Sequence, residues 1–330
     1  MFSQLFNGAA IRRALVSTSL VVLATSGTVI PAMSHAAAPM AATEAPGYFR
    51  MMLGTFEVTA LSDGTLDLPV DALLSADARQ TRADVASLHL EVPLETSFNA
   101  YLINTGEKLV LVDTGGGALF GSRLGQLARH IEAAGYRTSQ IDEVLLTHLH
   151  SDHIGGLMSD GQPAFANATV RADERESGYW LSAEARKSAA ANDLQFFDAA
   201  AALLTPYITA GKYRPFKAGS QVVPGISAVS ADGHTAGSTV YQVESQGRRL
   251  LLIGDLIHVG PVQFKRPDVT IAFDVDRNAA RATRVDVFQR AAVSGDLLGG
   301  SHLPFPGLGH LQAKGQGFQW LPLDYTTKVK

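Results

Sequence analysis

The strongest constraint on this chain is the segment 148–153, whose sequence HLHSDH places four potential metal ligands within six residues. It directly follows the apolar run 144–146, which predicts a buried strand. Side chains two positions apart in an extended segment point to the same side, so His148 and His150 can converge on one ion.

Asp152 and His153 can face a second ion beside the first. Gly155 and Gly156 follow them, and two glycines permit tight backbone geometry at that point. Neutral imidazole and carboxylate groups suit zinc and similar divalent ions. The segment therefore predicts a metal site with room for two ions.

Composition narrows the function classes. The chain has 330 residues, of which 46% are hydrophobic and 18% charged, and its formal net charge is −4. This is a globular composition, and no cluster of Lys or Arg indicates a nucleic-acid partner. The chain has no cysteine, which excludes disulfides, thiolate catalysis and thiolate metal ligands.

The N-terminal residues 1–38 read as a secretory signal peptide. Arg12 and Arg13 precede the mostly apolar stretch 14–29, and small residues follow at 34–38. The stretch is short for a membrane span, so no stable anchor is expected. We expect export to the periplasm or the medium by the Sec route, or by the twin-Arg route that the adjacent arginines permit.

The remainder is predicted to be a short linker, 39–47, and a single domain, 48–330. The pattern predicts a strand at 56–61 that a turn at Ser62-Asp63-Gly64 ends. Further predicted elements are hairpins at 100–104/109–113 and 240–244/248–253, helices near 124–131, within 173–204 and at 279–292, and a strand at 297–298. Mixed strands and helices without regular βαβ alternation predict an α+β domain of two packed sheets with helices outside.

The H-x-H-x-D-H pattern, with an apolar strand before it and two glycines after it, resembles the signature of the metallo-β-lactamase superfamily. The resemblance implies a four-layered αβ/βα sandwich with two metal ions at one edge between the sheets. His234, Asp255 and His302 follow in the order that the family requires. It implies one ion held by His148, His150 and His234, a second held by Asp152, His153 and His302, and Asp255 as the bridge.

Asp113, in the sequence LVDTG, matches a further position of the superfamily near the metal histidines. A carboxylate there can accept an imidazole N–H and fix the direction of the ring. The alternative is that Asp113 only caps a turn.

From about Tyr48 onward, the chain resembles the methyl parathion hydrolases and the related dihydrocoumarin-type aryl-lactonases. The segments that carry this resemblance are 60–65, 93–97, 170–173, 179–182 and 301–307. The resemblance implies a homodimer and a substrate pocket beside the ions. Its lining would comprise Phe120, Trp180, Phe196, His258, Ile271, Phe273 and Leu73.

Phe273 and His258 leave less room for a tetrahedral phosphorus, and Leu73 stands where the phosphotriesterase has Arg. We therefore expect a dinuclear-metal hydrolase that opens aryl lactones and esters with an ion-activated water, with side activity on organophosphate triesters. Asp255 and Asp152 are the expected catalytic carboxylates. Zinc is the expected metal, while manganese, cobalt and iron also suit these ligands.

Four alternatives remain. The first two are a methyl parathion-type phosphotriesterase and an acyl-homoserine lactonase. The third is a periplasmic metal-binding protein without catalysis. The fourth is a redox member of the superfamily, which would need iron or a flavin partner.

Overall fold

Alternating side chains along strand β3 (Leu94–Asn104) contribute to two separate apolar cores. Tyr101 and Ile103 join a core that contains residues of both sheets, whereas Ala100 and Leu102 join a core with helices α3 (Leu127–Ala133) and α7 (Leu194–Thr209). The period of two is the ordinary geometry of a strand buried on both faces. The computed structural model describes residues 38–329.

The first sheet has six strands in the order β1-β2-β3-β4-β5-β8. Besides β3, its strands are β1 (Tyr48–Leu53), β2 (Phe56–Leu68), β4 (Leu109–Val112), β5 (Glu143–Leu145) and β8 (Thr169–Arg171). The pairs β4–β5 and β5–β8 are parallel, so the carboxyl ends of these strands meet at one edge.

The second sheet has seven strands in the order β15-β14-β13-β12-β11-β10-β9. They are β9 (Gln221–Val223), β10 (Ile226–Ser230), β11 (Thr239–Ser245), β12 (Arg248–Leu252), β13 (Leu297–Gly299), β14 (Leu308–Lys314) and β15 (Gly317–Pro322). Strands β12 and β13 are parallel. A short separate hairpin is formed by β6 (Met158–Ser159) and β7 (Gln162–Pro163).

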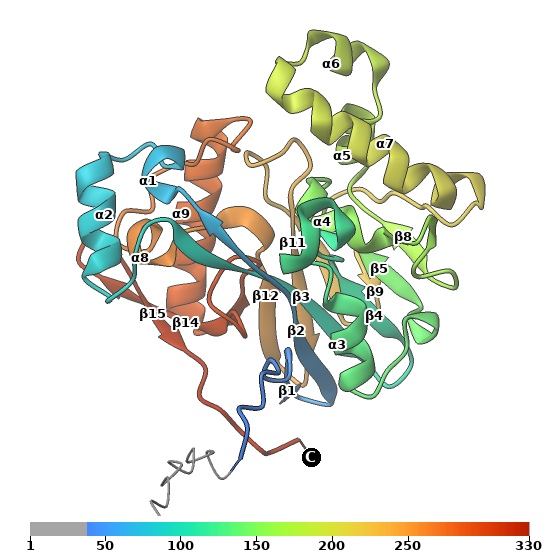
Figure 1. Cartoon of the computed structure of the whole chain (residues 1–330), viewed down its shortest axis with the longest axis horizontal. Coiled ribbons are helices and arrows are strands. Elements are labelled where there is room, and N and C mark those ends of the chain that lie inside the picture. The colour runs from blue at the N-terminus through green and yellow to red at the C-terminus, as the bar shows by residue number, and fades with distance from the viewer. Residues whose placement is uncertain (1–37, 330) are drawn as a thin grey trace, which may run out of the picture. The chain divides into compact units, whose positions relative to one another are not determined.

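The helices cover the outer faces of the two sheets. On the first sheet lie α3, α7 and α5 (Glu174–Trp180), whereas α9 (Arg277–Ser294) packs on the second. The remaining helices are α1 (Val70–Leu73), α2 (Ala78–Ala86), α4 (Ser151–Ile154), α6 (Ala183–Ser188) and α8 (Gly260–Gln263). Figure 1 shows α5, α6 and α7 grouped together, and α1, α2 and α8 grouped elsewhere. This confirms the predicted α+β class with a four-layered αβ/βα sandwich.

The predicted turn at Ser62-Asp63-Gly64 is wrong. Strand β2 runs through these residues to Leu68, with a bulge between Ser62 and Gly64. Instead of ending the strand, the buried Asp63 carboxylate accepts hydrogen bonds from the backbone N–H groups of Gly116 (2.9 Å) and Leu127 (3.0 Å). A turn-forming sequence thus serves as a bulge that ties β2 to the loop before α3.

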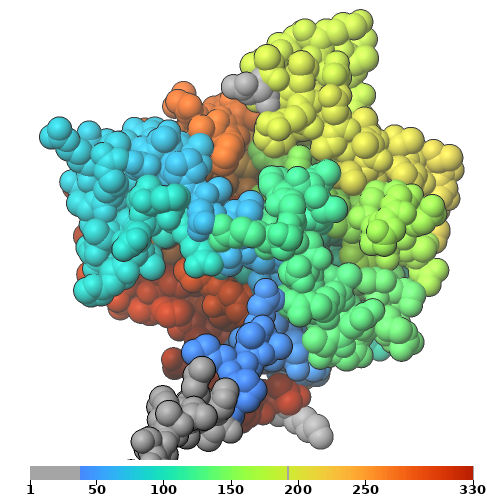
Figure 2. Space-filling model, in the orientation of Figure 1, coloured from blue at the N-terminus to red at the C-terminus, as the bar shows by residue number. Residues whose placement is uncertain are grey.

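Gly64 has φ +132°, and a Cβ there would lie 1.9 Å from the Arg123 carbonyl oxygen. The bulge therefore needs glycine for two reasons. In the view of Figure 2, the surface of β1 and β2 (blue) lies between that of α1 and α2 (cyan) and that of α3 (green).

Residues 44–329 belong to one compact unit, and residues 38–43 are not part of it. Apart from Ala38, the predicted signal peptide at 1–38 lies outside the described residues. Within 38–329, no helix is both long and apolar enough to cross a membrane.

Asp63 generates a prediction about pH and stability. Burial raises its pKa to about 6, although its backbone hydrogen bonds oppose the change. Between the unfolded pKa of about 4 and this value, the folded state binds more protons than the unfolded state, so the contribution of Asp63 to stability falls as pH rises. We expect the free energy of unfolding of the parent, relative to D63N, to fall by roughly 2 to 3 kcal/mol from pH 4 to pH 7.

Urea unfolding of both proteins across this pH range measures that difference. Groups elsewhere titrate alike in the two proteins and cancel. A difference between parent and D63N that stays constant from pH 4 to pH 7 would contradict the account.

Candidate metal centre

Four strand ends bring the candidate ligands together. Segment 148–153 follows β5, and His234 follows β10. Asp255 lies in the single turn η5 (Gly254–Leu256) directly after β12, and His302 follows β13. The site is therefore assembled from both sheets at one edge of the sandwich.

The two glycines after the ligand segment let the backbone of residues 114–116 approach closely. A Cβ on Gly155 would lie 2.0 Å from the Gly116 carbonyl oxygen, and one on Gly156 would lie 2.0 Å from the Thr114 carbonyl oxygen. Their absent side chains let the loop that follows β4 pack directly beneath α4. The Thr114 N–H donates a hydrogen bond to the His153 carbonyl oxygen at 2.7 Å.

The side chains form two donor groups that share one carboxylate. The first group is His148, His150, His234 and Asp255, and the second is Asp152, His153, Asp255 and His302. Within each group, one ligand atom per residue lies within 4.8 Å of the others. All seven predicted ligands are thus brought together, in the two sets that the sequence predicted.

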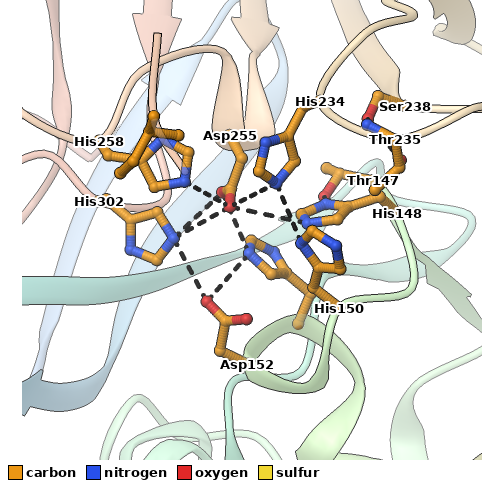
Figure 3. Close-up of polar contacts among 12 residues, drawn as sticks. Thr147, His148, His150, Asp152, His234, Thr235, Ser238, Asp255, His258 and His302 are labelled. Atoms are coloured by element: carbon orange, nitrogen blue, oxygen red, sulfur yellow. Dashed lines mark hydrogen bonds and ion pairs between the residues drawn. The ribbon is translucent and has the colours of Figure 1, made fainter. Parts of the chain in front are cut away.

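Asp255 lies at the centre of the arrangement (Figure 3). Its carboxylate oxygens are 3.1 Å from the Nε2 atoms of His153, His258 and His302. The Nε2 atoms of His234 and His148 lie 3.3 Å and 3.6 Å from the same carboxylate. Five imidazoles therefore surround one buried anion.

The chemistry of these donors fits divalent cations. His148 Nε2, His153 Nε2 and Asp255 Oδ1 are buried and make no hydrogen bond. Buried polar atoms are ordinarily paired, so three unpaired ones that point into the same cluster indicate space for a ligand. Nitrogen and carboxylate oxygen in groups of four match the coordination that zinc prefers.

Most of the rings are oriented by a hydrogen bond on the nitrogen that faces away from the cluster. His153 Nδ1 lies 2.8 Å from Asp113 Oδ2, and His234 Nδ1 lies 2.9 Å from Asp274 Oδ1. His302 Nδ1 lies 3.2 Å from the Ser97 carbonyl oxygen. These partners leave Nε2 of each ring directed at the cluster, as a ligand that binds through a neutral nitrogen needs.

Electrostatics divide the histidines into two kinds. Burial lowers the pKa of His150 to about 3, and burial together with neighbouring His153 lowers the pKa of His148 well below its ordinary value. Burial also opposes the charge on His234 and His302, but the Asp255 carboxylate raises the pKa of His234 to about 9 and that of His302 to about 10. Metal ions bound here would replace the protons on His234 and His302.

Asp113 is positioned by the backbone before the ligand segment. Its two oxygens accept hydrogen bonds from the Thr147 N–H and hydroxyl, both at 2.8 Å. Asp113 also adopts φ +60°, in the left-handed region. The carboxylate thus contacts both the start of the ligand segment and His153.

The sequence analysis missed Asp274 and its partner Arg284. Asp274 is buried, accepts a hydrogen bond from the Ile271 N–H, and lies 3.6 Å from Arg284 Nη2. Arg284 is fully buried in α9 and donates to the carbonyl oxygens of Leu256 and Val269. Nothing in the local sequence, where Asp274 is one of two acids in FDVD, distinguishes this buried carboxylate from a surface one.

The predicted substrate residues fall into four places. Trp180 and Phe196 lie against His150, with ring centroids 5.4 Å and 4.7 Å from it. Phe273 lies 6.2 Å from His258 and is 38% exposed.

Phe120 is 37% exposed in the loop before α3, where its ring packs over Gly116. Ile271 is buried in a small apolar cluster against which Leu73 packs. These two aliphatic residues therefore belong to a core, and their contact with a substrate stays a prediction.

A cavity of about 1260 Å³ adjoins the cluster on a wall that the sequence analysis did not identify. His258 and His302 line it together with Leu94, Phe264 and Leu303. Of the seven predicted substrate residues, only His258 is part of this lining. The sequence did not predict this cavity because its lining comes from five separate parts of the chain, including the β14–β15 hairpin.

Comparison with known families gives one match over most of the chain. Residues 96–302 match the model described as the metallo-beta-lactamase superfamily. That range contains every candidate metal ligand and more than half of the 330 residues.

Two solved structures are similar over nearly their full length. One is described as hydrolase AbOPH in the beta lactamase superfamily: it has 33% sequence identity and a TM-score of 0.83, over 86% of this chain and 100% of that one. The other is AidC, described as a dizinc quorum-quenching lactonase in complex with a product: it has 27% identity and a TM-score of 0.79, over 85% of this chain and 99% of that one.

Curated proteins match a shorter part. Lactamase-like protein adaB of Aspergillus niger is 44% identical over 59 residues, which are 18% of this chain and 17% of that protein. The chain thus spans under a fifth of the length of this curated relative.

Asp274 generates a prediction about metal affinity. D274N keeps the shape but removes the charge that holds His234, so we expect the affinity for one of two zinc ions to fall about 10- to 100-fold. Competition with a chromophoric zinc chelator measures this affinity.

D276N is the matched control, because Asp276 is an acid two residues away that caps α9 and contacts no ligand. It should keep the parental affinity for both ions. Equal zinc affinity in D274N and D276N would show that Asp274 does not position His234.

Proposed function

Because this chain belongs to the metallo-beta-lactamase superfamily, we propose that it is a dinuclear zinc hydrolase that opens lactones and esters, with aryl lactones as the preferred class. Activity on organophosphate triesters is proposed as a side reaction. The seven residues that form the two donor groups are proposed as the metal ligands, with Asp255 between the ions.

The observation that carries the proposal is the position of aromatic rings directly beside one donor group. Phe196 is partly exposed and packs on the His150 ring, which the buried Trp180 also contacts, so a flat substrate ring can pack on Phe196 close to the ligand cluster. Aromatic faces favour such rings through buried area and through stacked or edge-on contacts. This supports a substrate whose scissile carbonyl is attached to, or fused with, an aryl group.

Two divalent ions, when bound, would supply a Lewis acid for the carbonyl and lower the pKa of water to about 7. The side chains of this protein would orient the reacting groups. Asp152 is the most exposed ligand, with 18% of its side chain accessible, whereas Asp255 is buried. Asp152 is therefore the ligand carboxylate that solvent reaches most readily, and it is placed to accept a proton from the attacking water.

His258 lies on the other side of Asp255 from Asp152 (Figure 3), and we propose that it contacts the substrate there. Its Nε2 lies 3.1 Å from Asp255 Oδ2, and its ring stacks on that of His302 at 5.0 Å. Phe273 adjoins the same ring, so this wall offers an apolar face and a polar edge. A planar lactone fits such a wall better than a phosphorus centre with three substituents.

A second candidate is an acyl-homoserine lactonase. Its support is the 27% identity to AidC, which is described with N-hexanoyl-homoserine as product. The cavity beside His258 and His302 has apolar residues such as Leu94, Phe264 and Leu303 among polar ones, and these apolar residues would accept a flexible acyl chain. The two candidates share the site and the reaction. They differ in whether the lactone carries an aryl ring or an acyl chain.

We also propose export of the mature chain and a homodimeric state. The proposed export rests on the apolar N-terminal stretch behind Arg12 and Arg13. The proposed dimer rests on resemblance to the aryl-lactonase group. Metal loading and assembly would then be completed outside the cytoplasm or, by the twin-Arg route, before export.

Substrate competition tests the proposed function. The zinc-loaded mature protein should hydrolyse dihydrocoumarin with a kcat/KM at least tenfold above that for N-hexanoyl-homoserine lactone, and far above that for methyl parathion. The physical reason is the stacking that only an aryl ring gains. A preference for the acyl lactone would establish the second candidate, and no turnover of any lactone or ester would overturn both.

F196L is the matched variant, because leucine keeps an apolar side chain but removes the ring. An aromatic contact adds about 0.5–1.5 kcal/mol beyond buried area, so kcat/KM on dihydrocoumarin should fall about 3- to 10-fold. The value for the acyl lactone should stay near that of the parent. Equal losses on both lactones would contradict the proposed aryl contact.

A further inference from the structure

Glu176 is a buried carboxylate that the proposed chemistry does not use. It lies in α5 and is 0% exposed. Within residues 38–329, Glu176 forms no ion pair with Lys, Arg or His, although its neighbours Glu174 and Arg175 each form one. Burying a carboxylate without a cation costs free energy of folding unless hydrogen bonds satisfy its oxygens. The hydrogen-bond partners of Glu176 therefore explain why it can be buried.

Three N–H groups donate to Glu176. Oε2 accepts from the backbone N–H of Leu149 and from the indole Nε1–H of Trp180, each at 3.0 Å. Oε1 accepts from the backbone N–H of Gly237 at 2.6 Å. Backbone and indole N–H groups cannot act as acceptors. Both oxygens therefore accept hydrogen bonds, which oppose the rise in the pKa of Glu176 that burial causes.

These partners belong to the two segments that hold the first donor group. Leu149 lies between His148 and His150, and Gly237 lies in the loop that begins at His234. Trp180 packs on the His150 ring. One carboxylate thus joins both ligand loops and the buried Trp180 side chain that packs on His150.

The fit at Gly237 is close. A Cβ on Gly237 would lie 2.9 Å from the Glu176 backbone nitrogen and 3.1 Å from its Cγ. Glycine therefore lets the His234 loop approach Glu176 closely enough for a short hydrogen bond. The same loop is closed by Thr235 N–H, which donates to Ser238 Oγ at 2.9 Å.

We propose that Glu176 is a positioning residue that sets the spacing between the His148–His150 segment and the His234 loop, and that fixes Trp180 beside them. The inference rests on the proposed function, because it takes these three histidines as ligands of one ion. Its distinctive consequence is selectivity. Loss of Glu176 disturbs the first donor group, whereas His153 and His302 of the second group are held by Asp113 and by the Ser97 carbonyl oxygen.

E176Q tests the inference. The amide keeps the shape but replaces one acceptor by an NH₂ group that faces an N–H donor. We expect the affinity for one of the two zinc ions to fall about 10- to 100-fold, the range for lost supporting contacts of metal ligands, while the other ion binds as in the parent. Chelator competition gives the two affinities, and tryptophan fluorescence should shift because the Trp180 hydrogen bond changes.

Two variants isolate the role. E174Q makes the same chemical change on the same helix, at an acid whose side chain is 52% exposed, and should bind both ions like the parent. W180F removes the indole donor and leaves a smaller ring in the core, but it keeps the hydrogen bonds from Leu149 and Gly237 to Glu176, so it should keep both zinc affinities. If E176Q does not fold, E176D keeps the charge with a shorter reach and should show the same selective loss.

The outcomes are separable. A folded E176Q that binds both ions with parental affinity would overturn the inference, as would an equal loss at both sites, which indicates only general destabilisation. A parent protein that binds no zinc at all would overturn the proposed function first. Selective weakening of one ion in E176Q, with E174Q unchanged, supports the inference.

Discussion

The interaction on which the site depends is the contact of one buried carboxylate with five imidazoles. Asp255 lies 3.1 to 3.6 Å from the rings of His148, His153, His234, His258 and His302. Burial raises the pKa of Asp255, but the histidines around it lower that pKa well below the ordinary range. So many polar groups can be buried together only when charges balance and hydrogen bonds or ions satisfy them. The sandwich brings four strand ends to one edge and thereby makes this assembly possible.

Buried acids outside the cluster hold the loops that converge on Asp255. Asp113 supports His153, Asp274 supports His234, and Glu176 joins the loops of the first donor group. Each carboxylate accepts backbone N–H groups as well, so the position of a ligand ring is fixed relative to the main chain. A hydrolytic site needs such support because an error of about 1 Å in a reacting group can cost about 100-fold in rate.

How far the sequence predicts the structure differs between local and long-range features. The ligand segment, the hairpins and the two-sheet arrangement follow from periodicity and from the spacing of residues 148–153, which are local. Asp274 and Glu176 escaped because each is an ordinary-looking acid in a polar stretch, and only the fold shows that it is buried. The bulge at Asp63 was mistaken for a turn, since its partners Gly116 and Leu127 are more than fifty positions away. The cavity beside His302 was not predicted either, because its lining residues are far apart in the sequence.

The central claim is that Asp255 lies between two ions held by the two donor groups. Anomalous diffraction at the zinc edge from crystals of the zinc-loaded mature protein tests it most directly. The account predicts two peaks about 3.5–4 Å apart, one next to His148, His150 and His234 and the other next to Asp152, His153 and His302, with Asp255 contacting both. A single peak, or peaks away from these side chains, would contradict it.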